Sequence, residues 1–342
     1  MRIDSIMHAY QGEAPGASVL VMHNQSSIVR CCYGYAELES HRQVTPATNF
    51  RLASVTKQFT AAAVLLLAQD GRLTLDDPVR KWLPSLPDAA RGVTIRQLLS
   101  HTSGLIDYEH LIPARTTQQL HDEDVLRLIE AQNRTYFPPG TAYRYSNGGY
   151  ALLAVIVARA SGARFASFLQ ERIFVPLGMQ GSIAYEAGVS SVGQRAFGYS
   201  LRGERWMRTD QGLTSAVLGD GGIYSSADDL AKWDAALSAP GLLSAESLRL
   251  AFSPATVTED PCVRYGLGWR LTGETVWHSG ETLGFRNAIV RWPQRHFTVI
   301  VLTNRNDPEA YSLALAIAKL FYADADVPRA SRVVVGSDGG ER

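Results

Sequence analysis

Runs of apolar, β-branched and aromatic residues mark strands at both ends of the chain. Residues 17–22 and 27–38 have this character and are separated by the polar residues 23–26, so we predict a β-hairpin there. Near the other end, four segments predict further strands: 266–271, 275–278, 285–292 and 298–303. A closing helix is predicted over 307–321.

The middle of the chain has a different pattern, in which apolar residues recur at helical spacing. It predicts helices over 93–99, 122–132, 147–160, 165–174 and 227–237, joined by loops rich in Gly and Pro. An almost wholly apolar run over 58–69 predicts a helix that is buried on most sides. The whole pattern predicts an α/β (α+β) fold, in which both chain ends build one antiparallel sheet flanked by helices and a mainly helical lobe is inserted.

This pattern divides the chain into two lobes. We expect residues 1–75 and 225–330 to form the sheet lobe, residues 76–224 the helical lobe, and residues 331–342 a frayed tail. A chain of 342 residues is long enough for two packed lobes. Because a cleft between lobes is a usual place for a small-molecule site, we expect the active site there.

Composition removes several classes of function. The formal net charge is zero, which argues against nucleic acid or an anionic membrane as the main partner. No apolar run reaches the roughly 20 residues that a membrane span needs. Residues 1–11 lack the apolar core of a signal peptide, so we expect a cytoplasmic protein, although removal of an export signal leaves the same sequence.

The candidate chemistry begins with Ser54 and Lys57, which open the predicted apolar helix. Unpaired N–H groups at a helix N-terminus favour a developing oxyanion, and residues three apart lie on one helix face. A serine needs a neighbour to take its proton; a buried lysine can do this, whereas arginine stays protonated. Only four of the 33 basic residues are lysines, so a lysine here suits that role. Taken alone, the pair also fits a capping serine and a solvated lysine.

A second motif is Tyr145-Ser146-Asn147, which directly precedes a predicted helix. A tyrosine hydroxyl near an ammonium group can serve as a general base. Asn147 offers both a donor and an acceptor, which suits it to hold a substrate carbonyl and to steady Lys57. In isolation, the same residues also fit a loop tyrosine and a helix cap.

A third motif, His278-Ser279-Gly280-Glu281, stands at the end of a predicted strand. The glycine lets a substrate approach the strand edge closely, and His278 and Ser279 are expected to face that substrate. The backbone N–H of Glu281 is a candidate to pair with the N–H of Ser54 as an oxyanion hole. Alone, the motif also fits a strand-end turn with a surface histidine.

The three motifs occur once each and in this order. With them, the sequence resembles the serine β-lactamase and penicillin-binding-protein superfamily, which uses Ser-x-x-Lys, Tyr-x-Asn and Lys/His-x-Gly. The resemblance is to the branch of class C β-lactamases, D-aminopeptidases, D-Ala-D-Ala carboxypeptidases and family VIII esterases. It extends over about residues 12–322, and further matching stretches lie at 50–53, 98–105, 138–150, 221–226 and 265–269.

The resemblance implies a serine hydrolase that works through an acyl-enzyme without a metal or cofactor. Ser54 is then the nucleophile, and Lys57 and Tyr145 are its proton partners, with the formal base left open between them. These two groups are expected to titrate as a coupled pair. Asn147 orients the substrate, and the amides of Ser54 and Glu281 form the oxyanion hole.

Two departures from the family pattern bear on the substrate. His278 replaces the lysine of β-lactamases, and near pH 7 a histidine is only partly charged. Glu281 stands where small residues are common, so its carboxylate is expected to repel anions or attract an ammonium group. We therefore expect an esterase or D-amino-acid amidase or peptidase acting on small substrates. The alternatives are a β-lactamase or D-Ala-D-Ala carboxypeptidase, and a non-catalytic penicillin-binding-like sensor or assembly protein. The oligomeric state is left open.

Other candidates receive simpler interpretations. Ser100 and His101 are neighbours that rarely face each other at a helix end. Asp107, Asp122 and the histidines between them have no metal spacing, so we interpret them as solvated surface. The chain has no Gly-x-Ser-x-Gly and no phosphate-binding loop, which disfavours an α/β-hydrolase and a nucleotide enzyme. The loops 107–117 and 185–211 are expected to decide specificity.

Overall fold

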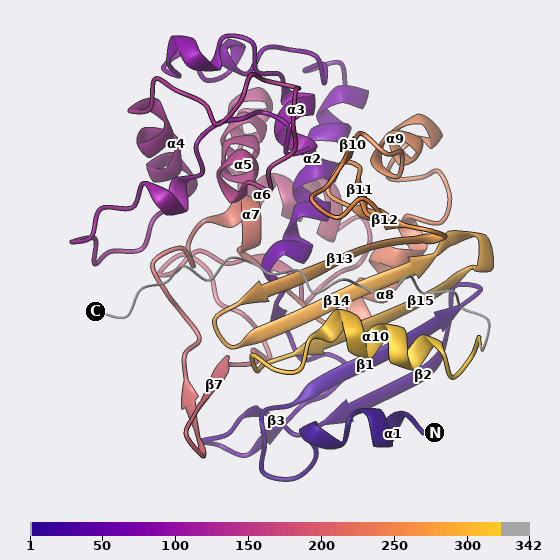
Figure 1. Ribbon diagram of the computed structural model, residues 1–342. Coiled ribbons are helices and arrows are strands. Elements are labelled where there is room, and N and C mark those ends of the chain that lie inside the picture. Colours follow the sequence, from indigo (N-terminus) through magenta and orange to yellow (C-terminus); the bar gives the residue numbers. More distant parts are fainter. Residues whose placement is uncertain (1, 323–342) are drawn as a thin grey trace.

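A computed structural model describes residues 2–322, so the predicted tail and residues 323–330 lie outside the described part of the chain. Its centre is an antiparallel sheet of eight strands, seen across Figure 1. In spatial order they are β10 (Thr256–Val257), β11 (Arg264–Tyr265), β12 (Arg270–Thr272), β13 (Thr275–Thr282), β14 (Phe285–Trp292), β15 (Phe297–Thr303), β1 (Ala17–His23) and β2 (Ser26–Tyr33).

The sheet joins the two ends of the chain, as predicted. β1 pairs with β15 from Ala17 opposite Thr303 to His23 opposite Phe297. The predicted hairpin is confirmed too, because β1 and β2 are joined by Asn24 and Gln25, which both have positive φ (50° and 63°). Two such residues suit the tight turn that matches the twist of a hairpin.

One predicted strand, 266–271, is wrong in its bounds. The chain instead turns between β11 and β12, where Gly268 has a φ of +79°. A side chain at Gly268 would meet the carbonyl oxygen of Lys57, so the turn is held close to the predicted nucleophile helix. β13 extends to Thr282, four residues beyond the predicted end at 278.

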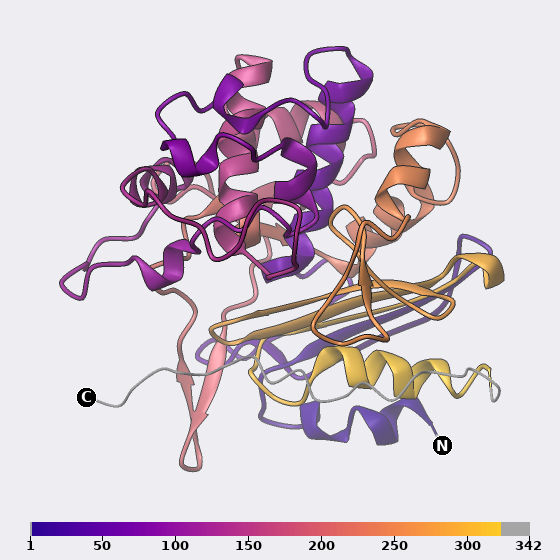
Figure 2. The ribbon, with the colours of Figure 1, turned by 45° about the horizontal axis from the view of Figure 1, so that its top comes forward.

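Side chains of the central strands alternate between two apolar layers, as an antiparallel sheet requires. Val19 and Val301 belong to the layer between the sheet and α10 (Ala310–Ala318), whereas Leu20 and Ile300 belong to the larger core on the opposite face. Figure 2 shows α10 and the short N-terminal helix α1 (Ile3–Ile6) under the sheet and the other helices above it.

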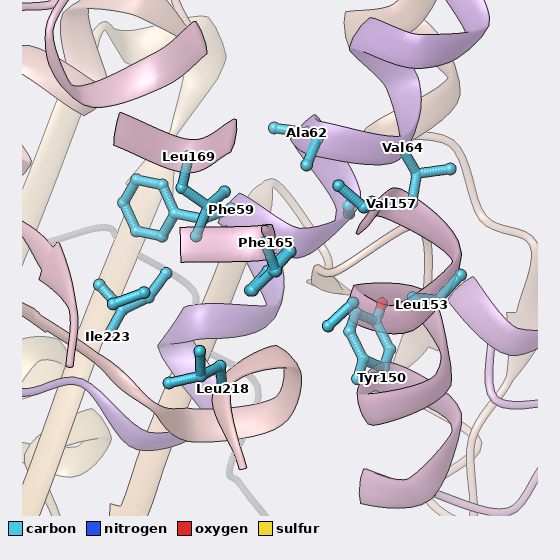
Figure 3. Packing of buried hydrophobic residues seen from close by; sticks show 14 of the residues in the cluster. Phe59, Ala62, Val64, Tyr150, Leu153, Val157, Phe165, Leu169, Leu218 and Ile223 are labelled. Atoms are coloured by element: carbon cyan, nitrogen blue, oxygen red, sulfur yellow. The ribbon is translucent and has the colours of Figure 1, made fainter. Parts of the chain in front are cut away.

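The helices above the sheet are α2 (Lys57–Gln69), α3 (Ile95–Leu99), α4 (Asp122–Glu130), α5 (Asn147–Ser161), α6 (Phe165–Leu169), α7 (Leu218–Gly221), α8 (Ala227–Ala236) and α9 (Ala245–Ala251). They confirm the predicted helices within a few residues; the one over 165–174 changes to a π-helical turn at Gln170–Phe174. Figure 3 shows α2 and α5 side by side, with Val64 and Val157 in the shared core. The lobe boundaries at residues 75 and 225 stay a prediction.

Three smaller sheets complete the fold: β5 (Phe50–Arg51) with β9 (Ile223–Ser225) and β6 (Ile183–Ala184), β3 (Tyr35–Glu37) with β4 (Arg42–Gln43), and β7 (Tyr199–Arg202) with β8 (Arg205–Arg208). The first brings residues far apart in sequence to the start of α2. Among the described residues, no single helix has the length and apolar character to cross a membrane; only α5 with 165–174, bent by 77°, passes as a pair.

Candidate active site

Ser54 lies in a 3-10 turn, Ala53–Thr56, between β5 and α2. Of residues 48–67, Ser54 alone is not buried, because the apolar α2 and the strand before it are enclosed by core. Ala53 has a φ of +49°, a left-handed conformation that costs energy for a residue with a side chain. The amide of Leu52 donates to the carbonyl oxygen of Ile223 (2.8 Å), which fixes the turn against β9. The nucleophile candidate is therefore presented by a strained, anchored turn.

Lys57 is fully buried one helical turn beyond Ser54. Its Nζ donates to Ser54 Oγ (3.0 Å), Asn147 Oδ1 (2.8 Å) and the carbonyl oxygen of Asp220 (3.0 Å). Three oxygen atoms match the three donors of an ammonium group. The structure thus brings three sequence-predicted residues, Ser54, Lys57 and Asn147, into one hydrogen-bonded chain.

Tyr145 is the fourth member of this group. Lys57 Nζ lies 4.9 Å from the centre of the Tyr145 ring, which stacks on the ring of His101 at 4.3 Å. No hydrogen bond of the described residues involves the Tyr145 hydroxyl. Such a loose contact is common in a free enzyme, since catalytic hydrogen bonds often tighten only with substrate. Ser146 caps α5 by accepting from the amide of Gly149 (3.0 Å), which fixes the residues on either side of it.

The third motif forms the open edge of β13. β12 pairs only with residues 275–277, so the edge from His278 to Thr282 faces the turn that carries Ser54. Gly280 allows this approach, because a Cβ there would overlap the carbonyl oxygen of Leu52 and lie 3.1 Å from the amide nitrogen of Val55. Ser279 is half-buried on the same stretch and Glu281 is exposed.

His278 is placed differently from what the sequence led us to expect. Its side chain is buried, with Nε2 3.0 Å from the Tyr265 hydroxyl and Nδ1 2.6 Å from the carbonyl oxygen of Ser279. Burial lowers the pKa of His278 well below its usual value, and the charges of Arg270 and Lys57 lower it further. A neutral imidazole therefore lies beneath the site, where a partly charged one facing the substrate was expected.

Comparison with known proteins agrees with this arrangement. The family described as Beta-lactamase matches residues 3–323, which is almost the whole chain. The chain belongs to this family. Its members are generally serine hydrolases. The match covers nearly the whole chain, so it confirms the superfamily that the three motifs predicted.

The proteins to which this chain is similar include penicillin-binding proteins and an amidase. Penicillin-binding protein 4* of Bacillus subtilis is 33% identical over 94% of this chain and 74% of its own length. A penicillin-binding protein from Bacillus halodurans is 28% identical, with a TM-score of 0.81 over 94% of this chain and 99% of that chain. The D-amino acid amidase of Ochrobactrum anthropi SV3, with L-phenylalanine amide bound, shares the fold (23% identity, TM-score 0.80, 94% and 97% covered).

The sequence reasoning missed two carboxyl groups beside Ser54. A cavity of about 50 Å³ next to this serine is also lined by Asn147, Glu109 and Asp220. Glu109 Oε1 accepts from Asn147 Nδ2 (3.1 Å), and Asp220 Oδ2 accepts from the Tyr108 hydroxyl (3.1 Å). Burial raises the pKa of Asp220 to about 8. Only their positions in the sequence could have pointed to these two residues. Glu109 lies in the loop 107–117 that we expected to decide specificity, and Asp220 directly precedes the family-matching stretch 221–226.

Arg270 was also missed, although it directly follows the matching stretch 265–269. Its guanidinium carbon lies 5.5 Å from the ring centres of Tyr145 and Trp277 and 6.0 Å from that of Tyr265. Among the described residues, no carboxylate forms an ion pair with it, and it is only partly exposed. The β-lactamase-family site thus retains a permanent positive charge even though His278 is neutral.

Two carboxyl groups predicted to be solvated are instead held by backbone amides, Asp107 in a buried position and Asp122 in a half-buried one, which corrects that interpretation. Asp107 is 6% exposed and caps the turn Tyr108–His110. Asp122 accepts from the amides of Leu218 and Gly219 (3.0 Å each), and burial raises its pKa to about 7. His101 is also buried. Among the described residues, no group of three or more His, Cys, Asp or Glu is arranged to hold a metal ion.

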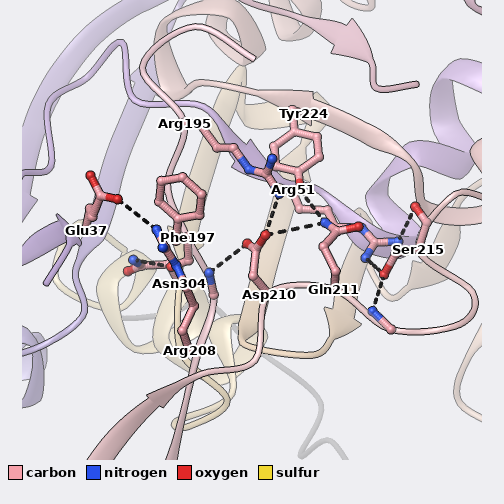
Figure 4. Close-up of polar contacts among 12 residues, drawn as sticks. Glu37, Arg51, Arg195, Phe197, Arg208, Asp210, Gln211, Ser215, Tyr224 and Asn304 are labelled. Carbon is pink, nitrogen blue, oxygen red and sulfur yellow. Dashed lines mark hydrogen bonds and ion pairs between the residues drawn. The ribbon is translucent and has the colours of Figure 1, made fainter. Parts of the chain in front are cut away.

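Arg51 supports the floor of the site through the network in Figure 4. It donates to Ser215 Oγ (2.5 Å), the carbonyl oxygen of Ser215 (3.1 Å) and that of Gly221 (3.3 Å). In the same view, Arg195 pairs with Asp210 and reaches Tyr224 on β9. These contacts tie the loop 193–215 to the strands that position Ser54.

Proposed function

We propose that the protein is a serine hydrolase that cleaves small esters or amides through an acyl-enzyme on Ser54. The observation that carries the proposal is the 3.0 Å contact between the accessible Ser54 Oγ and the buried Lys57 Nζ. Tyr145 lies beside this pair, and the open edge of β13 lies opposite. A nucleophile, proton-handling groups and a strand edge for the substrate are what acyl transfer needs.

In the proposed reaction, Ser54 Oγ attacks the substrate carbonyl carbon while its proton passes to Lys57 in its neutral amine form or to Tyr145 in its phenolate form. The amides of Ser54 and Glu281 stabilise the oxyanion. The carbon–oxygen or carbon–nitrogen bond then breaks, and the leaving alcohol or amine takes the proton. A water molecule next attacks the acyl ester, gives a proton to the same base, and releases the acid as Ser54 Oγ regains that proton.

The substrate class follows from the charges at the site. Since His278 is neutral and buried, it supplies no cation for a β-lactam carboxylate, which supports an esterase or amidase rather than a β-lactamase. The shared fold with a D-amino acid amidase is consistent with this choice. A β-lactamase or D-Ala-D-Ala carboxypeptidase remains the second candidate, because the positive charge of Arg270 beside Tyr145 suits the carboxylate of either substrate.

The test is intact-protein mass spectrometry with time on wild type and Ser54→Ala, mixed with a p-nitrophenyl ester or a chromogenic cephalosporin. Product release is followed in parallel. We expect wild type to turn over the ester and Ser54→Ala to lose roughly three or more orders of magnitude in rate, as loss of a nucleophile typically causes.

Each other outcome has a defined meaning. Faster turnover of the cephalosporin than of the ester would favour the β-lactamase alternative. A mass adduct on wild type that persists without turnover would favour a sensor. Full activity of Ser54→Ala would refute the proposed nucleophile.

A further inference from the structure

The cavity beside Ser54 contains a carboxylate that is not held in an ion pair with a lysine or arginine of the described residues. Glu109 lines this cavity together with Ser54 and Asn147, and the only hydrogen bond of its carboxylate among the described residues is the one from Asn147 Nδ2 (3.1 Å). Within residues 2–322, no lysine or arginine forms an ion pair with Glu109. An uncompensated carboxylate at the mouth of a site is available to a positively charged group on a ligand.

Glu109 is held firmly in this position. The Asp107 carboxylate accepts from the amide of Glu109 (3.2 Å) through Oδ1 and from the amide of Gly148 (3.1 Å) through Oδ2. Tyr108, between them, is buried and donates to Asp220. The turn that carries Glu109 is therefore fixed to the first residues of α5, which also position Asn147.

Glu281, the carboxylate that the sequence suggested for this role, is in a different situation. Its Oε2 lies 3.6 Å from Nε of Arg286, an ion pair that offsets its charge. Arg286 also lies 3.4 Å from Glu309. Of the two exposed carboxylates that line the cavity, Glu109 is thus the one that forms no ion pair with an arginine or lysine of the described residues.

We propose that Glu109 binds the free α-ammonium group of the substrate, so that the protein prefers amino-acid amides or esters with an unblocked amine. The proposal rests on the proposed function, because it needs the scissile carbonyl at Ser54. In such a substrate the amine nitrogen and the attacked carbonyl carbon are separated by a single carbon atom. A hydrogen-bonded chain from Ser54 through Lys57 and Asn147 ends at Glu109, and the carboxylate lines the same cavity as the nucleophile.

The electrostatics of the cavity are consistent with a cationic ligand. Although much of Glu109 is exposed, its carboxyl group lies among many protein atoms. This desolvation raises its pKa and Asp107 raises it further, while the hydrogen bond from Asn147 and the charge of Lys57 oppose the shift. A bound ammonium favours the ionised carboxylate and thus offsets that desolvation. Arg51, the one cation among the residues lining this cavity, already donates to Ser215 and Gly221.

The test compares wild type, Glu109→Gln and Glu109→Asp on alanine p-nitroanilide and its N-acetyl derivative, each as D and L enantiomers. We expect wild type to prefer the free amine. Glu109→Gln is expected to lower kcat/KM for the free amine by about 10- to 100-fold, the loss typical of one charge-assisted hydrogen bond, with little change for the N-acetyl form. Glu109→Asp, which keeps the charge, should recover part of that loss.

Glu246→Gln, which removes an exposed carboxylate of α9, is the matched control and should leave the preference unchanged. Equal losses on both substrates in Glu109→Gln would overturn the proposal, since Glu109 would then only position Asn147. A wild type without preference for the free amine would also overturn it, while Ser54-dependent turnover of p-nitrophenyl acetate would leave the proposed function standing. Failure of wild type on every substrate would reject both.

Discussion

At the scale of single residues, Arg270 is the charge whose role is most open. Three aromatic rings surround its guanidinium, and such cation–π contacts contribute modestly to stability. They do not neutralise the charge, and no described carboxylate forms an ion pair with it, although the charge of Glu259 acts on it from a greater distance. Its proximity to Tyr145 means that a negative group bound there would lie next to a proposed proton-handling residue. This leaves two roles to separate, packing of the rings and binding of a substrate carboxylate.

Replacing Arg270 by Met separates these roles, because Met keeps the bulk and removes the charge. If Arg270 binds a carboxylate, kcat/KM for N-acetyl-D-alanyl-D-alanine should fall by about 10- to 100-fold relative to its C-terminal amide, mainly through KM. Arg270→Lys should retain part of the difference. Steady-state kinetics on the two peptides measures it, and equal losses on both would assign Arg270 to packing alone.

The sequence predicts a site when its residues recur at a fixed local spacing. Ser54 and Lys57 meet because three residues make about one helical turn. Asn147 joins them only through the packing of α5 on α2. Its position beside Lys57 could be predicted only because the Tyr145-Ser146-Asn147 motif resembles that of a known family. Glu109 and Arg270 have no local pattern, since tertiary contacts alone bring them to Ser54. His278 could be named from sequence, but its burial beside Tyr265 could not, because that contact depends on how the strands β11, β12 and β13 fold onto one another.

At the scale of elements, the contact between β13 and the turn Ala53–Thr56 decides the geometry of the site. Gly280 is the point of closest approach, because the open edge of β13 passes directly against the backbone at Leu52 and Val55. Backbone atoms cannot move away as the end of a side chain can. Any side chain at this position must therefore separate the strand from the nucleophile turn.

Gly280→Ala is expected to lower kcat by at least about 100-fold, since a displacement of roughly 1 Å in a reacting group costs that much. It should also lower the melting temperature. Gly241→Ala is the matched control, because a Cβ there meets nothing within 4 Å. Kinetics and thermal unfolding of both variants measure these effects. Unchanged activity of Gly280→Ala would show that the turn and strand can separate without harm.

Elements with a strong apolar period were the most predictable. β14 and the start of α5 fall where the sequence places them, because burial on a sheet face or in a helical core demands that period. The strand predicted at 266–271 failed, since its apolar residues serve a turn that packs Gly268 against the backbone of Lys57. The apolar residues of 266–271 correctly indicate a buried segment, but apolar character alone does not show that the backbone is extended.

At the scale of the whole molecule, β1 from the start of the chain pairs with β15 from near its end, and residues of both strands contribute to the apolar layers on the two faces of the sheet. The larger core continues from the sheet through α2 to α5, so the nucleophile turn lies inside it rather than on a surface loop. This position explains why Asp220, a carboxyl group near the site, is buried, and why Asp122 is half-buried. Their ionisation must affect the stability of the entire fold.

The pH dependence of stability tests this link. Burial raises the pKa of Asp220 to about 8 from its ordinary value of 3.8, so the folded state retains a proton that the unfolded state has lost. The contribution of Asp220 is therefore fully present below about pH 4 and is lost as pH rises towards 8, by at most about 1.4 kcal/mol per pH unit. Asp122, with a pKa of about 7, acts in the same direction.

We expect the melting temperature of wild type to fall between pH 5 and pH 8 and that of Asp220→Asn to fall less, because an amide does not ionise and can still accept from Tyr108. Asp122→Asn should instead be destabilised at every pH by about 1–3 kcal/mol, since its amide nitrogen would face the N–H of Leu218 or Gly219. Calorimetry across this range measures both effects. Parallel curves for wild type and Asp220→Asn would mean that Asp220 is ionised in the folded protein, with Lys57 as the nearest compensating charge.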